Sequence, residues 1–141
     1  MNRFTSAGLI PFFTTTLFAA NACAAGLVVT VKPVTKAQGK VMVAIYNSES
    51  GFQKTMALGA VKPATTGEMT FNFPDLSTGN YAVMVYQDLN GNEKLDSNMF
   101  GIPKEPWGAS LQGKTVFGAP AWKDTRFELP DKGLSLSIDL N

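Results

Sequence analysis

The chain has 141 residues, with 12 basic and 11 acidic side chains, no histidine and a single cysteine, Cys23. Without histidine there is no His-based catalytic triad and no His-ligated zinc, copper or iron. One cysteine builds neither a thiolate cage nor an intramolecular disulfide, so the metal ligands that remain are oxygen atoms. The near-neutral charge also argues against nucleic acid or an anionic membrane surface as the main partner, because both are bound through clustered lysines and arginines.

The N-terminus has the features of a secretory signal peptide. Arg3 precedes an uncharged, largely apolar run, and Ala22-Cys23-Ala24 is a small-x-small sequence of the kind that signal peptidase cleaves. The run is short for a spanning helix, which needs about 20 apolar residues. A membrane anchor, or a lipid on Cys23, is the alternative. We expect a signal peptide at residues 1–24, a periplasmic or secreted location, and no membrane span after cleavage.

Cleavage at this point removes 24 of the 141 residues and leaves 117, with 11 basic and 11 acidic side chains and no cysteine. We expect residues 25–141 to form a single domain. A secreted domain of this size without disulfides is held together by its own core, by oligomerisation or by a bound ion.

Alternating apolar side chains predict β-strands along most of the mature chain. The predicted strands are centred on residues 27–31, 41–45, 71–73, 81–85, 127–129 and 134–140. No ten-residue stretch has a helical apolar period, and proline and glycine occur throughout. The pattern therefore predicts an all-β fold, a small antiparallel β-sandwich (immunoglobulin-like or transthyretin-like) of about seven strands with one long ordered loop.

One face of these strands is expected to form a common core. The residues assigned to it are Val29, Val43, Phe73, Val83, Val85, Leu136 and Ile138. The strand tyrosines, Tyr46, Tyr81 and Tyr86, are also expected to be core residues.

The connection between Asp88 and Arg126 has no clear period, and it contains five glycines, three prolines and both tryptophans. Compact domains rarely carry so long a connection without a function. We expect its 97–125 segment to meet a partner, either another protein or a small-molecule ligand. Trp107 and Trp122 are expected to cap the core, and a platform that stacks a sugar or peptide is the alternative.

Side-chain oxygens occupy alternate positions at the start of this connection, as in the first nine residues of an EF-hand loop. This spacing lets a tight turn direct several hard oxygen ligands at one calcium ion. The predicted metal ligands are the side chains of Asp88, Asn90, Asn92 and Asp96 and the carbonyl of Lys94. The sequence therefore predicts a calcium-binding loop.

Two positions depart from the EF-hand pattern. Glu93 stands where a glycine would take the positive φ, and Met99 stands where a bidentate glutamate would complete the ligand shell. Glu105 or Asp75 would have to supply that carboxylate. The alternative is a plain polar turn, for which Asn90-Gly91 is sufficient.

Three segments in this order resemble a known family: Gly79-Asn-Tyr81-Ala82, the acidic loop from Asp88 to Asp96, and Gly101-Ile-Pro103-Lys-Glu105-x-x-Gly108. The chain resembles the domain of unknown function 2141 family of secreted bacterial proteins over essentially its whole mature length. The resemblance implies a β-sandwich and no established activity. Members commonly have a histidine and a glycine where this chain has Gln87 and Glu93, and an aromatic residue at the position of Ala109.

These features favour a non-catalytic periplasmic binding or interaction module with a calcium-stabilised loop. No enzyme is expected, because no nucleophile–base pair is present. One alternative is a carboxylate-based hydrolase that uses a pair from Asp88, Asp96, Glu105 and Asp124. The other is a structural or assembly protein that pairs through a strand edge. The exposed side of the last strand carries only small polar residues (Ser135, Ser137, Asp139), which are compatible with such pairing.

Overall fold

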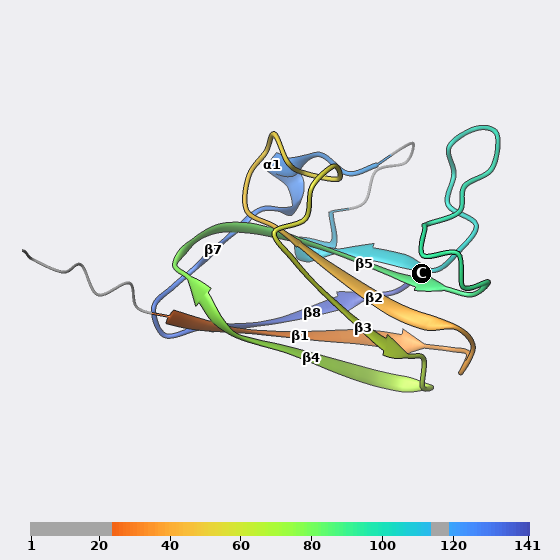
Figure 1. Ribbon diagram of the computed structural model, residues 1–141, viewed down its shortest axis with the longest axis horizontal. Helices are drawn as coiled ribbons and strands as arrows, with labels where there is room; N and C mark the ends of the chain where they lie inside the picture. Colours follow the sequence, from red (N-terminus) through yellow and green to blue (C-terminus); the bar gives the residue numbers. More distant parts are fainter. Residues whose placement is uncertain (1–23, 114–118) are drawn as a thin grey trace, which may run out of the picture.

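The structure is a computed structural model that describes residues 24–113 and 119–141 (Figure 1). The predicted signal peptide lies outside this part of the chain except for Ala24, the first residue of the first strand. In chain order the elements are β1 (Ala24–Val34), β2 (Lys40–Tyr46), β3 (Leu58–Pro63), β4 (Gly67–Ser77), β5 (Gly79–Asp88), β6 (Trp107–Ala109), the 3-10 turn η1 (Ser110–Gln112), α1 (Trp122–Thr125), β7 (Phe127–Leu129) and β8 (Leu134–Asp139).

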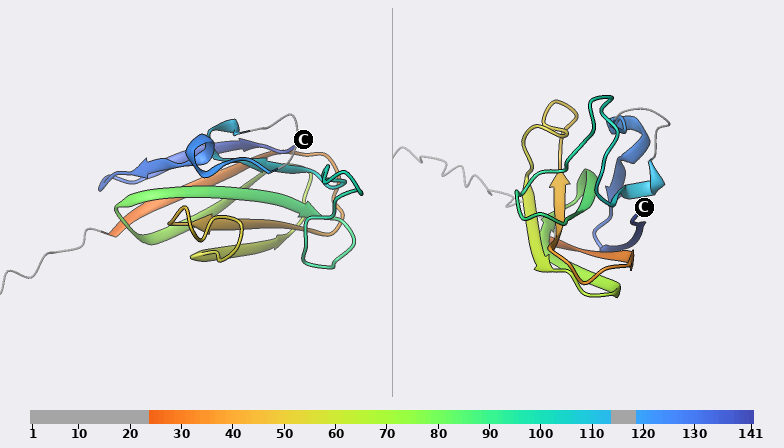
Figure 2. Two further views of the ribbon diagram at one scale, coloured as in Figure 1. Left: turned by 90° about the horizontal axis from the view of Figure 1, so that it is seen from above. Right: turned by 90° about the vertical axis from the view of Figure 1, so that its right-hand side faces the viewer.

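The strands form two sheets that pack around one core (Figures 1 and 2). One sheet has three strands in the order β4–β1–β8. The other has the order β3–β2–β5–β6, and β7 pairs with β5 beyond this path. The described residues thus contain eight strands, against about seven predicted, and the prediction of an all-β sandwich is confirmed.

One pairing differs from the predicted antiparallel arrangement, because β1 and β8 run parallel. The chain leaves β7 through residues 130–133 and enters the three-stranded sheet beside β1. Gly133 permits this crossing: its φ is +81°, and a Cβ atom there would lie 2.6 Å from the Gly26 carbonyl oxygen. Alternation along a strand carries no information about its direction, so the sequence pattern did not reveal this pairing.

The core lies between the sheets and contains the residues that alternation assigned to it. Val29, Val43, Phe73, Val83, Val85 and Ile138 are all buried. Leu136 packs against the core but is only partly buried, since β8 is an edge strand.

Leu136→Ala is therefore expected to cost about 1 to 2 kcal/mol of unfolding free energy. Replacing a fully buried leucine by alanine costs about 2 to 5 kcal/mol, and the exposed part of this side chain gains little from folding. Denaturant melts of the two proteins measure the difference. A cost above about 3 kcal/mol would show that Leu136 is a full member of the core.

Alternation missed two strands for different reasons. Most positions of β3 are exposed, so its sequence has no apolar side to detect. The other, β6, lies within the predicted long loop and has only three residues, the middle one being Gly108. A Cβ atom at Gly108 would lie 2.2 Å from the Asp139 carbonyl oxygen, so the close approach of β6 to β8 excludes any larger residue.

The exposed side of β8 was considered above as a site for strand pairing. Part of its outer edge is occupied by hydrogen bonds from Gln112 of the same chain. Gln112 donates from Nε2 to the Ser137 carbonyl at 3.3 Å and accepts at Oε1 from the Asp139 N–H at 3.4 Å. At the other side of the sandwich, β3 has only β2 as a strand partner within the described residues. The same holds for β4, which has only β1 as a strand partner there, so the edges of β3 and β4 are more open than that of β8.

Candidate functional site

The outer faces of the two sheets differ in polarity. The outer side of the three-stranded sheet includes Thr30, Lys32, Thr70, Asn72, Ser135 and Ser137. On the five-stranded sheet, the register places Met42 opposite Tyr86, and Tyr86 opposite Trp107. A contiguous apolar surface of this kind on a small domain often marks a binding site.

A row that contains three small residues and one methionine crosses this apolar face. Ala44 pairs with Gly59 on one side and with Met84 on the other, and Met84 pairs with Ala109. The adjacent row consists of large side chains: Val61, Met42, Tyr86 and Trp107. Gly59 and Ala44, beside the larger side chains of the adjacent row, leave a depression over β2 and β3.

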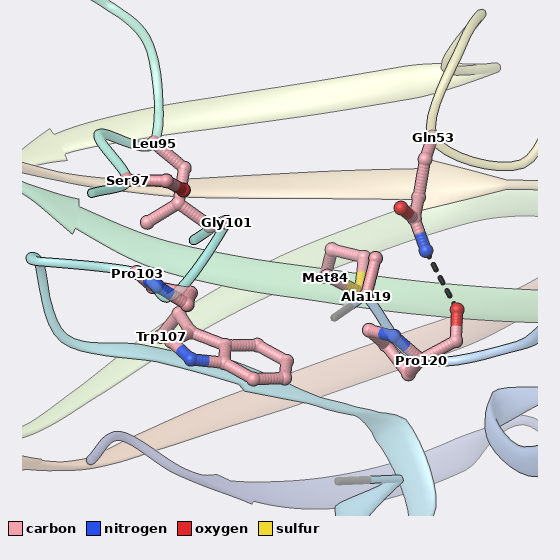
Figure 3. A pocket seen from close by; sticks show the side chains of 9 residues that line it. All are labelled: Gln53, Met84, Leu95, Ser97, Gly101, Pro103, Trp107, Ala119 and Pro120. Carbon is pink, nitrogen blue, oxygen red and sulfur yellow. Dashed lines mark hydrogen bonds between the residues drawn. The ribbon is translucent and has the colours of Figure 1, made fainter. Parts of the chain in front are cut away.

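The groove has three adjoining lobes, which hold about 510, 330 and 110 Å³. Ala44, Tyr46 and Tyr86 line both the large and the middle lobe. The middle and small lobes have Gln53, Met84 and Leu95 in common. Figure 3 shows the small lobe, where Met84, Leu95 and the Trp107 ring surround the space. Its side near Pro120 is fixed by Gln53, whose Nε2 donates to the Pro120 carbonyl at 2.7 Å.

Two loops on the same side of the sheet form the walls of the groove (Figure 1). Residues 47–57, which connect β2 and β3, contribute Gln53, Lys54 and Met56. The acidic loop after β5 contributes Glu93, Lys94 and Leu95. Leu95 thus lines the groove.

The tryptophans have separate roles. Trp107 lines the small lobe, which is the position expected of it if it belongs to a binding platform. Trp122 packs edge-on against Phe52, with ring centroids 5.7 Å apart, and Phe52 packs against Tyr46 at 5.2 Å. The Trp122 ring therefore packs against Phe52 of the 47–57 wall and stabilises this wall.

The prediction that all three strand tyrosines lie in the core is wrong for two of them. Tyr81 is buried in the core, but Tyr46 and Tyr86 are partly buried on the outer face. Burial raises the pKa of both hydroxyls, and for Tyr86 the carboxylates of Asp88 and Glu105 add to the effect. Both groove tyrosines are therefore neutral at physiological pH.

Asp88, the first of the predicted metal ligands, lies at the base of the acidic loop with no exposed surface. Its Oδ1 accepts from the Gly91 N–H at 2.7 Å, and its Oδ2 accepts from the Glu93 N–H at 2.8 Å. Burial raises the pKa of this carboxyl, but hydrogen bonds from the loop backbone outweigh burial and hold the pKa below its ordinary value. Asp88 is therefore a structural anchor of the loop.

Three other predicted ligands lie together at the exposed tip. Asn90 and Asn92 donate from Nδ2 to the two carboxylate oxygens of Asp96, at 2.5 and 2.9 Å. Their Oδ1 atoms accept from the N–H groups of Asn92 and Lys94, at 3.1 and 2.9 Å. The Lys94 side chain is exposed. Within the described residues, no group of three or more acidic, cysteine or histidine side chains is arranged to hold a metal ion.

Glu105 joins the two ends of the acidic loop. Its buried carboxylate accepts from the Leu89 N–H at 2.8 Å and from the Asp96 N–H at 3.0 Å. Asp75, the other candidate for a missing calcium ligand, lies beside the start of β1, at the opposite end of the sandwich (Figure 1). Asp124, considered for hydrolysis, is exposed on α1.

The groove on the sheet face was not predicted, although the sequence contains a signal for it. The strand sequences VMVAIY (41–46) and YAVMVY (81–86) are apolar on both sides, which is typical of strands covered on both faces. Alternation identifies the inward side of a strand and leaves the character of the outward side open.

Comparison with known proteins places the chain in a family. The model of a family described as an uncharacterised protein conserved in bacteria (DUF2141) matches residues 29–137. The chain belongs to this family. The DUF2141 match includes the acidic loop and the strands that form the groove, which confirms the resemblance noted from the sequence. No match was found among curated proteins or solved structures. Among the described residues, no helix has the length and hydropathy needed to cross a membrane.

Proposed function

We propose that this DUF2141 protein is a non-catalytic periplasmic or secreted binding module, and that its ligand lies in the groove across the five-stranded sheet. The observation that supports the proposal is the apolar outer face, which is hollowed at Gly59 and Ala44 between two loop walls. Ligand sites are concave, mostly apolar and furnished with a few polar groups. Part of the 97–125 segment takes part, since Ser97, Pro103, Trp107 and Pro120 line the small lobe.

We also propose that the acidic loop binds calcium through Asp88, Asn90, Asn92, the Lys94 carbonyl and Asp96. What supports this is the set of oxygens within nine residues and the backbone turns that hold them. Only two carboxylates belong to the set. That charge count suits the weaker sites of extracellular modules, with Kd values of about 10⁻⁴ to 10⁻³ M. Since the same loop carries Lys94 and Leu95, an ion would stiffen one wall of the groove.

Ala44→Phe tests the binding groove, because a phenyl ring on this floor residue fills the space between Gly59 and Met84. The probe is N-phenyl-1-naphthylamine, a neutral apolar dye whose fluorescence rises on binding. We expect the wild-type protein to bind the dye and the variant to bind it at least about 10-fold more weakly, the loss of about 1.4 kcal/mol.

Thr30→Phe is the matched control, because it adds the same ring to the outer face of the other sheet. This variant should bind the dye as the wild-type protein does. Equal dye binding by Ala44→Phe and wild-type protein would contradict the proposed site.

A further inference from the structure

We infer that the ligand of the groove is a linear apolar carboxylate of the fatty-acid type. This inference rests on the proposed function, since it names the chemistry of the molecule that the same groove binds. It follows from the shape of the groove, the nature of its floor and the charges on its walls.

The shape of the groove suits an elongated small molecule. It extends from β3 to β6 and so crosses three strand spacings, which is about 14 Å. Its larger lobes, of about 510 and 330 Å³, match the volumes of small-molecule sites. Met42, Met56 and Met84 line it, and methionine side chains adapt to flexible apolar chains.

The floor of the groove disfavours an extended peptide. A bound peptide satisfies its backbone N–H and C=O groups, usually by joining a free strand edge. Here most of the floor is made of side chains of β2 and β5, whose backbone groups are already paired with neighbouring strands, and β3 with its open edge lies only at one end of the groove. An alkyl chain has no such groups to satisfy.

The charges on the walls favour an anionic head group. Lys54 stands on the 47–57 wall and Lys94 on the acidic-loop wall. Neither forms an ion pair within the described residues. Among the described residues that line the groove, Glu93 is the one acidic side chain, and it lies 4.0 Å from Lys40 outside the groove lining. Two lysines in the lining of a groove with an apolar floor complement a molecule with one carboxylate and an apolar chain.

Three ten-carbon compounds test the inference by displacing N-phenyl-1-naphthylamine at pH 7.5. They are decanoate, decanol and decylamine, which share a chain and differ in head-group charge. Decanoate is expected to displace the dye at a concentration at least about 10-fold lower than decanol, and decylamine at the highest concentration. The double variant Lys54→Gln/Lys94→Gln should lose the preference for decanoate over decanol, measured as the ratio of the two displacing concentrations in the same protein.

Lys36→Gln/Lys132→Gln is the matched control, because both lysines are exposed away from the groove lobes. It should keep the wild-type preference. Equal displacement by decanoate and decanol, or an unchanged preference in Lys54→Gln/Lys94→Gln, would overturn the inference and leave the binding groove standing. Failure of the wild-type protein to bind the dye would overturn both.

Discussion

Asp88→Ala is expected to lower the free energy of unfolding by about 2 to 4 kcal/mol in the absence of any ion. The carboxylate is buried and accepts the N–H groups of Gly91 and Glu93. Each hydrogen bond to a charged group contributes about 1.5 to 3 kcal/mol. Part of this free energy is recovered in the variant, because Gly91 and Glu93 are exposed and their N–H groups can bond to water once the carboxylate is gone. A side chain that served only as a calcium ligand would behave differently, since its removal would leave the ion-free melt nearly unchanged.

Asp96→Ala is the control for this prediction. Its carboxylate accepts only from the side-chain amides of two exposed residues, Asn90 and Asn92, so its loss should cost less than about 1 kcal/mol. Denaturant melts in EDTA compare the two variants with the wild-type protein. Equal costs for the two substitutions would contradict the anchoring role of Asp88.

The same carboxylate makes stability depend on pH. Its pKa in the folded protein is below the ordinary value of 3.8, because the backbone hydrogen bonds that favour the charged form outweigh burial. A group with a lowered folded pKa contributes stability above its unfolded pKa and loses that contribution as the pH falls through the folded value. We expect the melting temperature of the wild-type protein to fall more steeply below about pH 4 than that of Asp88→Asn. Parallel acid curves for the two proteins would contradict this.

The fold was accessible from the sequence where a strand has one apolar and one polar side. This holds for β8, in which Leu134, Leu136 and Ile138 alternate with exposed serines. The strands β2 and β5 were also predicted, and Val43, Val83 and Val85 face the core as expected. What alternation did not reveal is that their outward side, with Met42, Met84 and Tyr86, is apolar as well. Which of these residues become neighbours depends on strand register, and no local pattern specifies it.

For the acidic loop, too, the sequence predicted the residues but not all of their contacts. Spacing identified the residues of the loop, and the missing position 12 carboxylate pointed to Glu105 or Asp75 as its replacement. In the structure Glu105 does reach the loop, but it binds two backbone N–H groups, of Leu89 and Asp96. A carboxylate and a backbone N–H attract each other as strongly as a carboxylate and a cation often do, so the residue type alone does not reveal which partner it takes.

The proposed calcium site predicts a large change in melting temperature. If calcium binds only the folded protein, a concentration of 100 times Kd stabilises it by about 2.7 kcal/mol. With a Kd of about 10⁻⁴ M, that concentration is about 10 mM. For a domain of this size, the expected rise in melting temperature between EDTA and calcium is on the order of 10 °C. Magnesium should give a smaller rise, because the flexible shell of several oxygens suits the larger ion.

The structure decides which variant tests this prediction. Asp88→Ala is unsuitable, because removing the buried anchor lowers the melt whether or not an ion binds. Asp96→Ala removes a proposed ligand at the exposed tip and should abolish the calcium-dependent rise while leaving the melt in EDTA nearly unchanged.

Glu68→Ala is the matched control, since it removes an exposed carboxylate from the three-stranded sheet, where Lys32 is its ion-pair partner at 3.5 Å. It should keep the full rise. Identical melts of the wild-type protein in EDTA and in 10 mM calcium would leave the loop a polar turn, held by Asp88 and Glu105 without an ion.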